Sequence, residues 1–229
     1  MKKILLGLFV FGFVQLNAQN AMEVLESTFA FLSSKNSVAF KSHASMSHDY
    51  DSLTLMENFT YTVKLKDHKK IHFSWTDGMK RKLINYNGKE LTFFSLDDSF
   101  FSKYNLDGDL NDLKKFVGDS LDYDMPFISL FSETELKEIL KSKPKSYFVG
   151  TKTFKGLSVH HLVFYTANFS WQMFVSADED NPVPYKIVVN DIENGTEFSC
   201  EFTHWDFSEI KNSEFGKSIG DFIEIKQGR

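Results

Sequence analysis

A strict alternation of apolar and polar residues recurs along this chain and limits what it can fold into. In residues 59–66, FTYTVKLK, every apolar side chain falls at an odd position and every polar one at an even position. This period of two is typical of an antiparallel strand that buries one face. Asn87-Gly88 predicts a type I′ hairpin turn between two such segments. Strands are expected at residues 38–41, 59–66, 71–75, 83–84, 91–94, 100–104, 146–154, 157–165, 169–176, 185–191 and 195–206.

Three short stretches instead carry apolar residues at helical spacing. Residues 20–34 place them at intervals of three and four, which predicts an amphipathic helix. Residues 109–117 do the same after an aspartate cap, with Gly118 interpreted as the residue that ends the helix. Residues 132–142 open on the capping box S-E-T-E and stop before Pro144. The sequence therefore predicts an α+β fold, a strongly curved antiparallel sheet covered by about three short helices.

The N-terminus has the three parts of a secretory signal peptide. Lys2 and Lys3 precede a short apolar run, and Ala18 supplies a small residue at a suitable cleavage point. We therefore expect residues 1–18 to be removed as a signal peptide. Residues 19–229 are expected to form a single domain. The two leading lysines are typical of a bacterial signal peptide, so we expect this domain in the periplasm.

The composition argues against several classes of protein. A net charge of −5 without a basic tract argues against nucleic acid as a partner. Cys200 is the one cysteine, so no internal disulfide can form and a cysteine-ligated metal cluster is not expected. His160 and His161 are adjacent in an expected strand and must point to opposite faces. We predict no metal site and no cofactor.

Residues 118–121 spell G-D-S-L, the letters around the nucleophilic serine of a large esterase family. That family supplies the base through a D-x-x-H motif and the oxyanion hole through a G-x-N-D block. No histidine of this chain has an aspartate three residues before it, and G-x-N-D is absent. Because a serine hydroxyl is inert at neutral pH without a base, Ser120 is interpreted as part of a helix end.

Phenylalanine accounts for 25 of the 229 residues. An aromatic-rich β core explains this number, and a cavity lined with aromatic side chains for an apolar ligand is the functional alternative. His161, which has the parity of Val159 and Val163, is open to the same two interpretations. It is either a core histidine bonded to a neighbour or, with Gln172, a polar element of a ligand pocket.

Most of the mature chain resembles a family of predicted periplasmic proteins of unknown function, with the specific letters of the likeness concentrated in its last third. The family pattern is Y-V-G, G, H-L-x-F, D-W-Q, P-L-P-x-K and a closing tryptophan. It occurs here as Tyr147-Phe148-Val149-Gly150, Gly156, His161-Leu162-Val163-Phe164, Trp171-Gln172, Pro182-Val183-Pro184-Tyr185-Lys186 and Trp205. Ser170 stands where the family has aspartate, which leaves no charged group at that position. The family is distantly similar to LolA/LolB-type lipoprotein carriers, and this implies a half-open β-barrel with a helical lid over an acyl-chain cavity.

The resemblance and the residue pattern lead to a first hypothesis, a non-enzymatic periplasmic binding protein. An apolar face under the helical lid would hold a lipid or the acyl chain of an acylated protein, with outer- or inner-membrane envelope proteins as further partners. Its lining is expected from Phe40, Phe59, Tyr61, Phe73, Trp75, His161, Trp171 and Met173. The second hypothesis is an envelope protein-interaction or sensor domain with a self-filled core. The third is an unrecognised hydrolase that uses Ser120.

Overall fold

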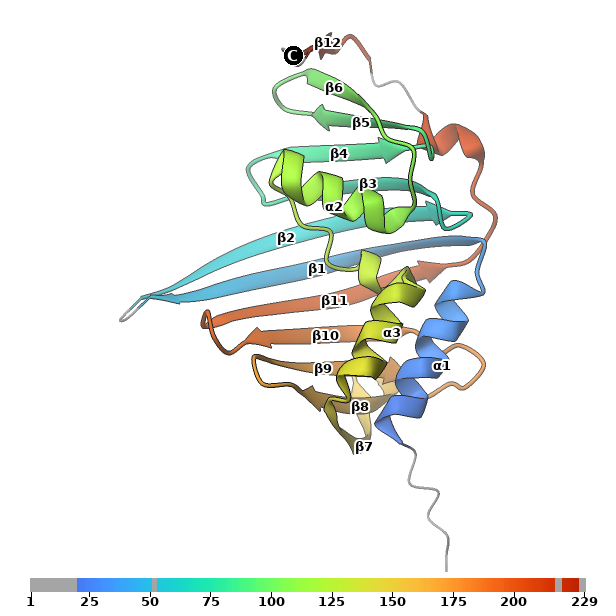
Figure 1. The fold of residues 1–229 in the computed structure, drawn as a ribbon, viewed down its shortest axis with the longest axis vertical. Coiled ribbons are helices and arrows are strands. Elements are labelled where there is room, and N and C mark those ends of the chain that lie inside the picture. Colours follow the sequence, from blue (N-terminus) through green and yellow to red (C-terminus); the bar gives the residue numbers. More distant parts are fainter. Residues whose placement is uncertain (1–19, 51–52, 217–219, 227–229) are drawn as a thin grey trace, which may run out of the picture.

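One twelve-stranded sheet runs through the protein (Figure 1). The computed structural model describes residues 20–50, 53–216 and 220–226, so the predicted signal peptide lies outside the described residues. The strand order is β12-β6-β5-β4-β3-β2-β1-β11-β10-β9-β8-β7, which places the central strands of the sheet far apart in the sequence. The strands are β1 (Ser37–Tyr50), β2 (Leu53–Lys66), β3 (Lys70–Thr76), β4 (Arg81–Tyr86), β5 (Glu90–Ser95), β6 (Phe100–Asn105), β7 (Lys145–Phe154), β8 (Leu157–Tyr165), β9 (Phe169–Ser176), β10 (Pro184–Asp191), β11 (Thr196–Asp206) and β12 (Ile223–Glu224).

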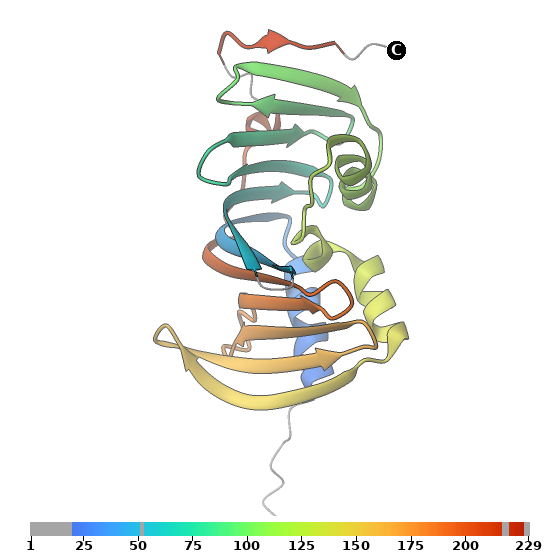
Figure 2. The same cartoon turned by 90° about the vertical axis from the view of Figure 1, so that its left-hand side faces the viewer.

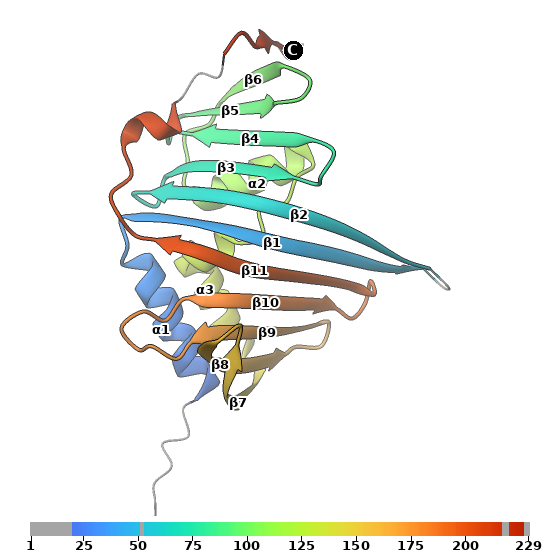
Figure 3. The same cartoon turned by 180° about the vertical axis from the view of Figure 1, so that it is seen from behind.

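The sheet is strongly curved and not closed. Neighbouring strands are antiparallel, with the exception of the parallel pair β12 and β6. Strands β7 and β12 end the strand order and do not pair with each other. Figure 2 shows the curvature edge-on, and Figure 3 shows the sheet in front of the three α-helices. The predicted α+β half-open barrel is therefore confirmed.

Three α-helices lie on one face of this sheet. They are α1 (Ala21–Ser33), α2 (Leu110–Leu121) and α3 (Glu133–Ser142), and the short 3-10 helix η1 (Ile128–Phe131) joins the last two. In Figure 1, α1 and α3 lie side by side over the strands β11 to β7, whereas α2 lies over the other half. None of the helices in the described ranges is long and apolar enough to span a membrane.

The prediction that Gly118 ends the second helix is wrong. Gly118 is exposed inside α2, and the chain leaves the helix at Asp122, which has a φ of 55°. A glycine in an exposed helix interior costs only about 1 kcal/mol. The Asp109–Asp112 capping box and three buried residues stabilise the helix, so that it continues beyond Gly118.

The Asn87-Gly88 hairpin joins β4 and β5 as predicted, but its turn is not type I′. Asn87 and Glu90 still pair through their backbones, which makes Gly88 and Lys89 the central residues. A type I′ turn needs a positive φ at both central residues, and only Gly88 has one, at 97°. The Asn87 side chain instead accepts hydrogen bonds from the backbone N–H groups of Lys89 and Glu90.

The β1–β2 hairpin is much longer than the predicted strands 38–41 and 59–66. Its pairing continues from Ser37↔Lys66 to Tyr50↔Leu53. Residues 53–58 are all exposed, and the hairpin projects beyond its neighbours in Figure 3. The sequence does not predict this part because a strand exposed on both faces has no alternation of apolar and polar residues.

Candidate ligand-binding site

Five of the predicted lining residues lie together on the concave face of β1, β2 and β3. Phe59 and Tyr61 alternate along β2, and Phe73 and Trp75 alternate along β3, so that all four point the same way. Ring centroids are 6.0 Å apart for Phe59 and Tyr61, 5.7 Å for Tyr61 and Phe73, and 4.8 Å for Phe73 and Trp75. Phe40 on β1 is buried in the same cluster. Period-two alternation thus builds a continuous aromatic face.

Trp171 and Met173 extend this face to the other half of the sheet. Both are on β9, where Met173 is opposite Leu162 and Trp171 is opposite Phe164. The Trp171 ring stacks on Phe164 at 4.9 Å, and Met173 is buried in the core cluster. Seven of the eight predicted lining residues therefore share one face.

His161 is the exception, because it points to the outer face of the sheet. It is opposite Phe174 in the β8–β9 ladder and stacks on that ring at 4.4 Å. Its Nε2 lies 2.9 Å from Gln172 Oε1, and its Nδ1 lies 3.1 Å from Lys152 Nζ. The expected pairing with Gln172 is present, but it is separated from the aromatic face by the sheet itself.

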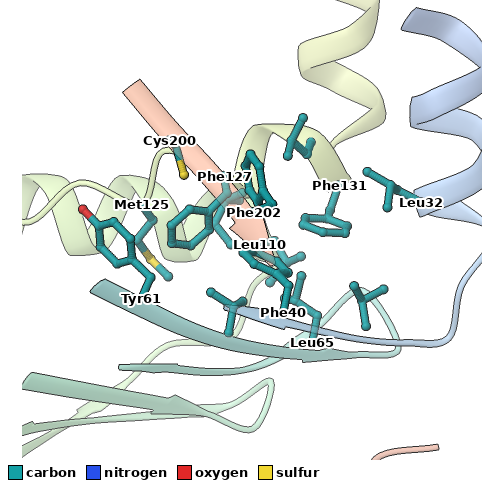
Figure 4. Packing of buried hydrophobic residues seen from close by; sticks show 14 of the residues in the cluster. Leu32, Phe40, Tyr61, Leu65, Leu110, Met125, Phe127, Phe131, Cys200 and Phe202 are labelled. Atoms are coloured by element: carbon teal, nitrogen blue, oxygen red, sulfur yellow. The ribbon is translucent and has the colours of Figure 1, made fainter. Parts of the chain in front are cut away.

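The aromatic face is occupied by the chain's own residues 123–131, which we call the plug segment. Its Phe127 ring lies 5.5 Å from Phe40, 5.2 Å from Tyr61 and 5.3 Å from Phe73. Figure 4 shows Phe127 and Phe131 among the side chains of the sheet. The apolar side chains of the plug segment that are fully or nearly fully buried are Met125, Phe127, Ile128, Leu130 and Phe131. The lid connection thus fills the space where a ligand cavity was predicted.

The hollows of the described surface lie outside the centre of this face, and one of them is lined by Phe59 at its end. A groove of about 420 Å³ between α2 and α3 is lined mostly by polar residues, among them Lys114, Asp124 and Glu135. Hollows of about 370 Å³ and 280 Å³ lie at the start of α3 and beside the β1–β2 hairpin. None of these three is lined by Tyr61, Phe73 or Trp171.

A few polar groups interrupt the aromatic face near its centre. Burial raises the pKa of the Cys200 thiol to about 12, although the neighbouring Ser42 hydroxyl opposes the shift. Burial, with Cys200 and Asp124 nearby, also raises the pKa of Tyr61. Both groups are therefore neutral at physiological pH, so neither serves as a nucleophile or a base there. The centre of this face is therefore largely apolar and uncharged.

Ser42 is a residue that the sequence analysis missed. It lies between Phe40 and Ala44 on β1 and has their parity, which is the signal that places it on the buried face. Its side chain is completely buried.

One lysine connects the three elements that cover the aromatic face. Lys114 of α2 lies 2.9 Å from Glu135 of α3 and donates a 2.9 Å hydrogen bond to Ser129 of η1. Helix α3 itself has no buried residue, since Leu136 and Ile139 are only half-buried. The plug segment and Lys114 therefore attach the cover to the rest of the protein more strongly than the side chains of α3 do.

The third hypothesis, a hydrolase that uses Ser120, finds no support in the geometry. Ser120 is exposed in the last turn of α2, and no hydrogen bond from a histidine reaches it within the described ranges. Residues 20–50, 53–216 and 220–226 hold no group of three or more histidine, cysteine, aspartate or glutamate side chains that could bind a metal ion.

A family model described as "Predicted periplasmic protein (DUF2092)" matches residues 21–219. No curated protein sequence gives a significant match.

Several solved structures resemble this fold at low identity. The Mycobacterium tuberculosis lipoprotein LppX is 10% identical with a TM-score of 0.51, covering 83% of this chain and 97% of its own. An uncharacterized conserved protein from Thermus thermophilus is 10% identical with a TM-score of 0.49, covering 90% and 99%. A LolA superfamily protein from Nitrosomonas europaea is 11% identical with a TM-score of 0.39, covering 86% and 98%. The similarity to LppX is one of fold.

Proposed function

Because the chain belongs to the DUF2092 family of predicted periplasmic proteins, we propose that it binds an apolar ligand in the periplasm. The ligand, a lipid or the acyl chain of an acylated protein, takes the place of the plug segment on the aromatic face. The protein acts as a binding protein and not as an enzyme. The observation that carries the proposal is the continuous aromatic face of Phe40, Tyr61, Phe73 and Trp75, covered by a lid connection.

The exchange of plug segment for ligand is feasible in free energy. Exposing an apolar side chain such as Phe127 costs roughly 1.5–3 kcal/mol, and an acyl chain regains about 0.8 kcal/mol for each methylene that it buries. Roughly 9 to 19 methylenes therefore balance the exposure of the five buried apolar side chains of the plug segment. The plug segment lowers the apparent affinity, since the ligand binds the fraction of molecules that is open. It also keeps the aromatic face dry between ligands.

Extraction of the native protein tests the proposal. The protein is purified from its host's periplasm, extracted with organic solvent and analysed by mass spectrometry, and a fluorescent acyl probe is titrated into the stripped protein. We expect a co-purifying lipid and saturable probe binding. Phe73→Leu, on the aromatic face, weakens the binding, whereas Phe174→Leu, on the outer face, is the matched control and leaves it unchanged. Absence of both lipid and probe binding would falsify the proposal.

A second candidate function is favoured by the burial of five apolar side chains of the plug segment: a protein-interaction domain whose core stays filled. Strand β7 ends the sheet, so the backbone groups along its outer edge are open to an added strand. Residues 139–177 contain five lysines and no aspartate or glutamate, within a chain of net charge −5. None of the described ion pairs involves Lys141, Lys143 or Lys145. The partner would be an acidic, extended peptide segment.

Peptide binding distinguishes this candidate from the first. A synthetic peptide of alternating glutamate and valine is titrated against the protein, with the lysine–valine peptide as the control. The second candidate predicts that only the acidic peptide binds, and that Lys143→Glu combined with Lys145→Glu abolishes the binding. If neither peptide binds, this candidate fails.

A further inference from the structure

Ser42 carries a buried hydroxyl whose polar neighbour in the closed protein is the Cys200 thiol, a weak hydrogen-bond partner. It lies in the middle of the sheet, opposite Tyr61 on β2 and opposite Phe202 on β11. Its exposed fraction is 0%. Among the described residues, Ser42 Oγ is the one buried side-chain oxygen or nitrogen that no oxygen or nitrogen pairs with, and the Cys200 thiol is the polar group beside it.

Packing alone does not explain a serine at this position. A buried hydroxyl that faces only a thiol loses its hydrogen bonds to water and gains at most a weak one in return. Alanine would fill nearly the same space without this penalty. Unpaired buried groups of this kind point to a partner that is absent from the closed state.

The groups around Ser42 are neutral hydrogen-bond formers. The Cys200 thiol is beside the Ser42 hydroxyl. Tyr61, which also carries a hydroxyl, is paired with Ser42 in the β1–β2 ladder. A thiol is only a weak donor and acceptor, so it does not replace the water that the hydroxyl has lost. Figure 4 shows Tyr61 and Cys200 near Met125 of the plug segment. The three polar groups therefore lie beneath the element that must move for a ligand to bind.

No lysine or arginine shares this face on the described parts of β1, β2 residues 59–65 or β11 residues 198–202, and Lys82, the basic side chain on the same face of β4, lies over the Tyr123 ring. On β1, the described side chains that share the face of Ser42 are Val38, Phe40, Ala44, Met46 and His48, and His48 is six residues, about 20 Å, along the strand from Ser42. Those on the same face of the neighbouring segments 59–65 and 198–202 are Phe59, Tyr61, Val63, Leu65, Phe198, Cys200 and Phe202. An ionised carboxylate would therefore be buried here without a counter-ion, which is strongly unfavourable.

We propose that Ser42, with Cys200 and Tyr61, binds the ester carbonyl of a neutral acyl ester on the aromatic face. The Ser42 hydroxyl donates to the carbonyl oxygen, while the acyl chain lies on Phe40, Phe73 and Trp75. A free fatty acid is disfavoured by its charge, and a plain hydrocarbon leaves the hydroxyl unpaired. This inference rests on the proposed function and narrows its ligand class.

Three probes that differ in one group test the inference. Pyrenedodecanoic acid, its methyl ester and dodecylpyrene are titrated at pH 8 into the stripped protein, and pyrene fluorescence reports binding. We expect the methyl ester to bind at least about ten times more tightly than the ionised acid. In Ser42→Ala, ester affinity falls roughly 2- to 10-fold, the equivalent of one hydrogen bond, while dodecylpyrene affinity is unchanged.

Ser102→Ala is the matched control. Ser102 of β6 is also a buried serine of the sheet, but its hydroxyl donates a hydrogen bond to the backbone carbonyl of Ile225. This variant should bind the ester as the wild type does. If dodecylpyrene binds as tightly as the ester, or if Ser42→Ala leaves ester affinity unchanged, the inference is overturned and the proposed function survives. If none of the three probes binds, both fail.

Discussion

Helices α1 and α3 lie side by side over the same half of the sheet, yet they are attached to it very differently. Six residues of α1 are buried, and Leu25, Phe29 and Leu32 belong to the core cluster. Helix α3 has no buried residue, although Leu136 and Ile139 give it an apolar side. The burial of apolar area anchors α1, whereas α3 is held by its neighbours.

The difference indicates which element can move. Local opening starts where few apolar contacts must be broken. Helix α1 is buried deeply enough to stay on the sheet as a fixed wall. Helix α3 is not, and it continues directly from the plug segment as part of the cover. Opening would then lift η1 and α3 together and leave α1 on the sheet.

The largest expected effect comes from matched leucine substitutions in the two helices. Leu25→Ala in α1 should lower the free energy of unfolding by about 2–5 kcal/mol, because it leaves a cavity in the core. Leu136→Ala in α3 should lower it by about 1 kcal/mol or less. Urea denaturation followed by circular dichroism measures both. Equal losses would remove the distinction between wall and cover.

The helix caps separate local opening from global stability. Asn20 caps α1 by accepting from Met22 N at 3.0 Å, and Ser132 caps α3 by accepting from Glu135 N at 3.2 Å. Either alanine variant should cost about 1 kcal/mol of global stability. Only Ser132→Ala should also raise the rate of thiol labelling at Cys200, by about 5-fold, since 1.4 kcal/mol corresponds to a factor of ten. A rise of equal size in Asn20→Ala would contradict this.

The Lys114–Glu135 ion pair provides a smaller test of the cover. Its side chains are about one-third exposed, and such pairs contribute about 0–1 kcal/mol. Lys114→Met should speed uptake of an acyl probe by at most about 5-fold in stopped-flow mixing. Lys137→Met is the control, because its ion pair with Glu133 lies within α3 at the surface. If both variants take up the probe at the wild-type rate, Lys114 does not restrain the cover.

The smallest expected effect is the pH dependence of stability that arises from His160, on the side of the sheet below the two helices. Burial lowers the pKa of His160, and the nearby Glu179 opposes this only in part. The unfolded chain, with a histidine pKa of about 6.5, then binds the proton more readily than the folded one. Stability should therefore fall as the pH drops below that value. His160→Gln should make this fall shallower in urea titrations at pH 7 and pH 5, and an unchanged pH dependence in this variant would contradict the prediction.

The sequence predicted elements with a repeating pattern well. The alternation in residues 59–66 identified the core of β2, and helical spacing located all three α-helices. The β1–β2 hairpin was underestimated because residues 53–58 are exposed on both faces. The end of α2 was missed because Gly118 is tolerated inside an exposed helix, and Asp122 adopts the left-handed conformation instead.

The candidate site was predicted less completely, for two physical reasons. Parity tells which residues of one strand share a face, but the register between strands comes from tertiary pairing, and it is this register that puts His161 opposite Phe174 on the outer face. The plug segment has neither period, since its 3-10 turn buries residues of irregular spacing. No pattern in residues 125–131 (MPFISLF) therefore predicts that they fill the space expected for a ligand cavity.

The central claim is that the plug segment opens while the rest of the protein stays folded, and Cys200 reports this directly. The wild-type protein has no other cysteine, and its thiol is buried on the aromatic face. Labelling by dithiobis(nitrobenzoate) is followed at pH 8 in increasing urea, below the unfolding transition. The account predicts labelling faster than global unfolding allows, with a weaker urea dependence than the global m-value. Labelling at the rate of global unfolding, with its full urea dependence, would contradict it.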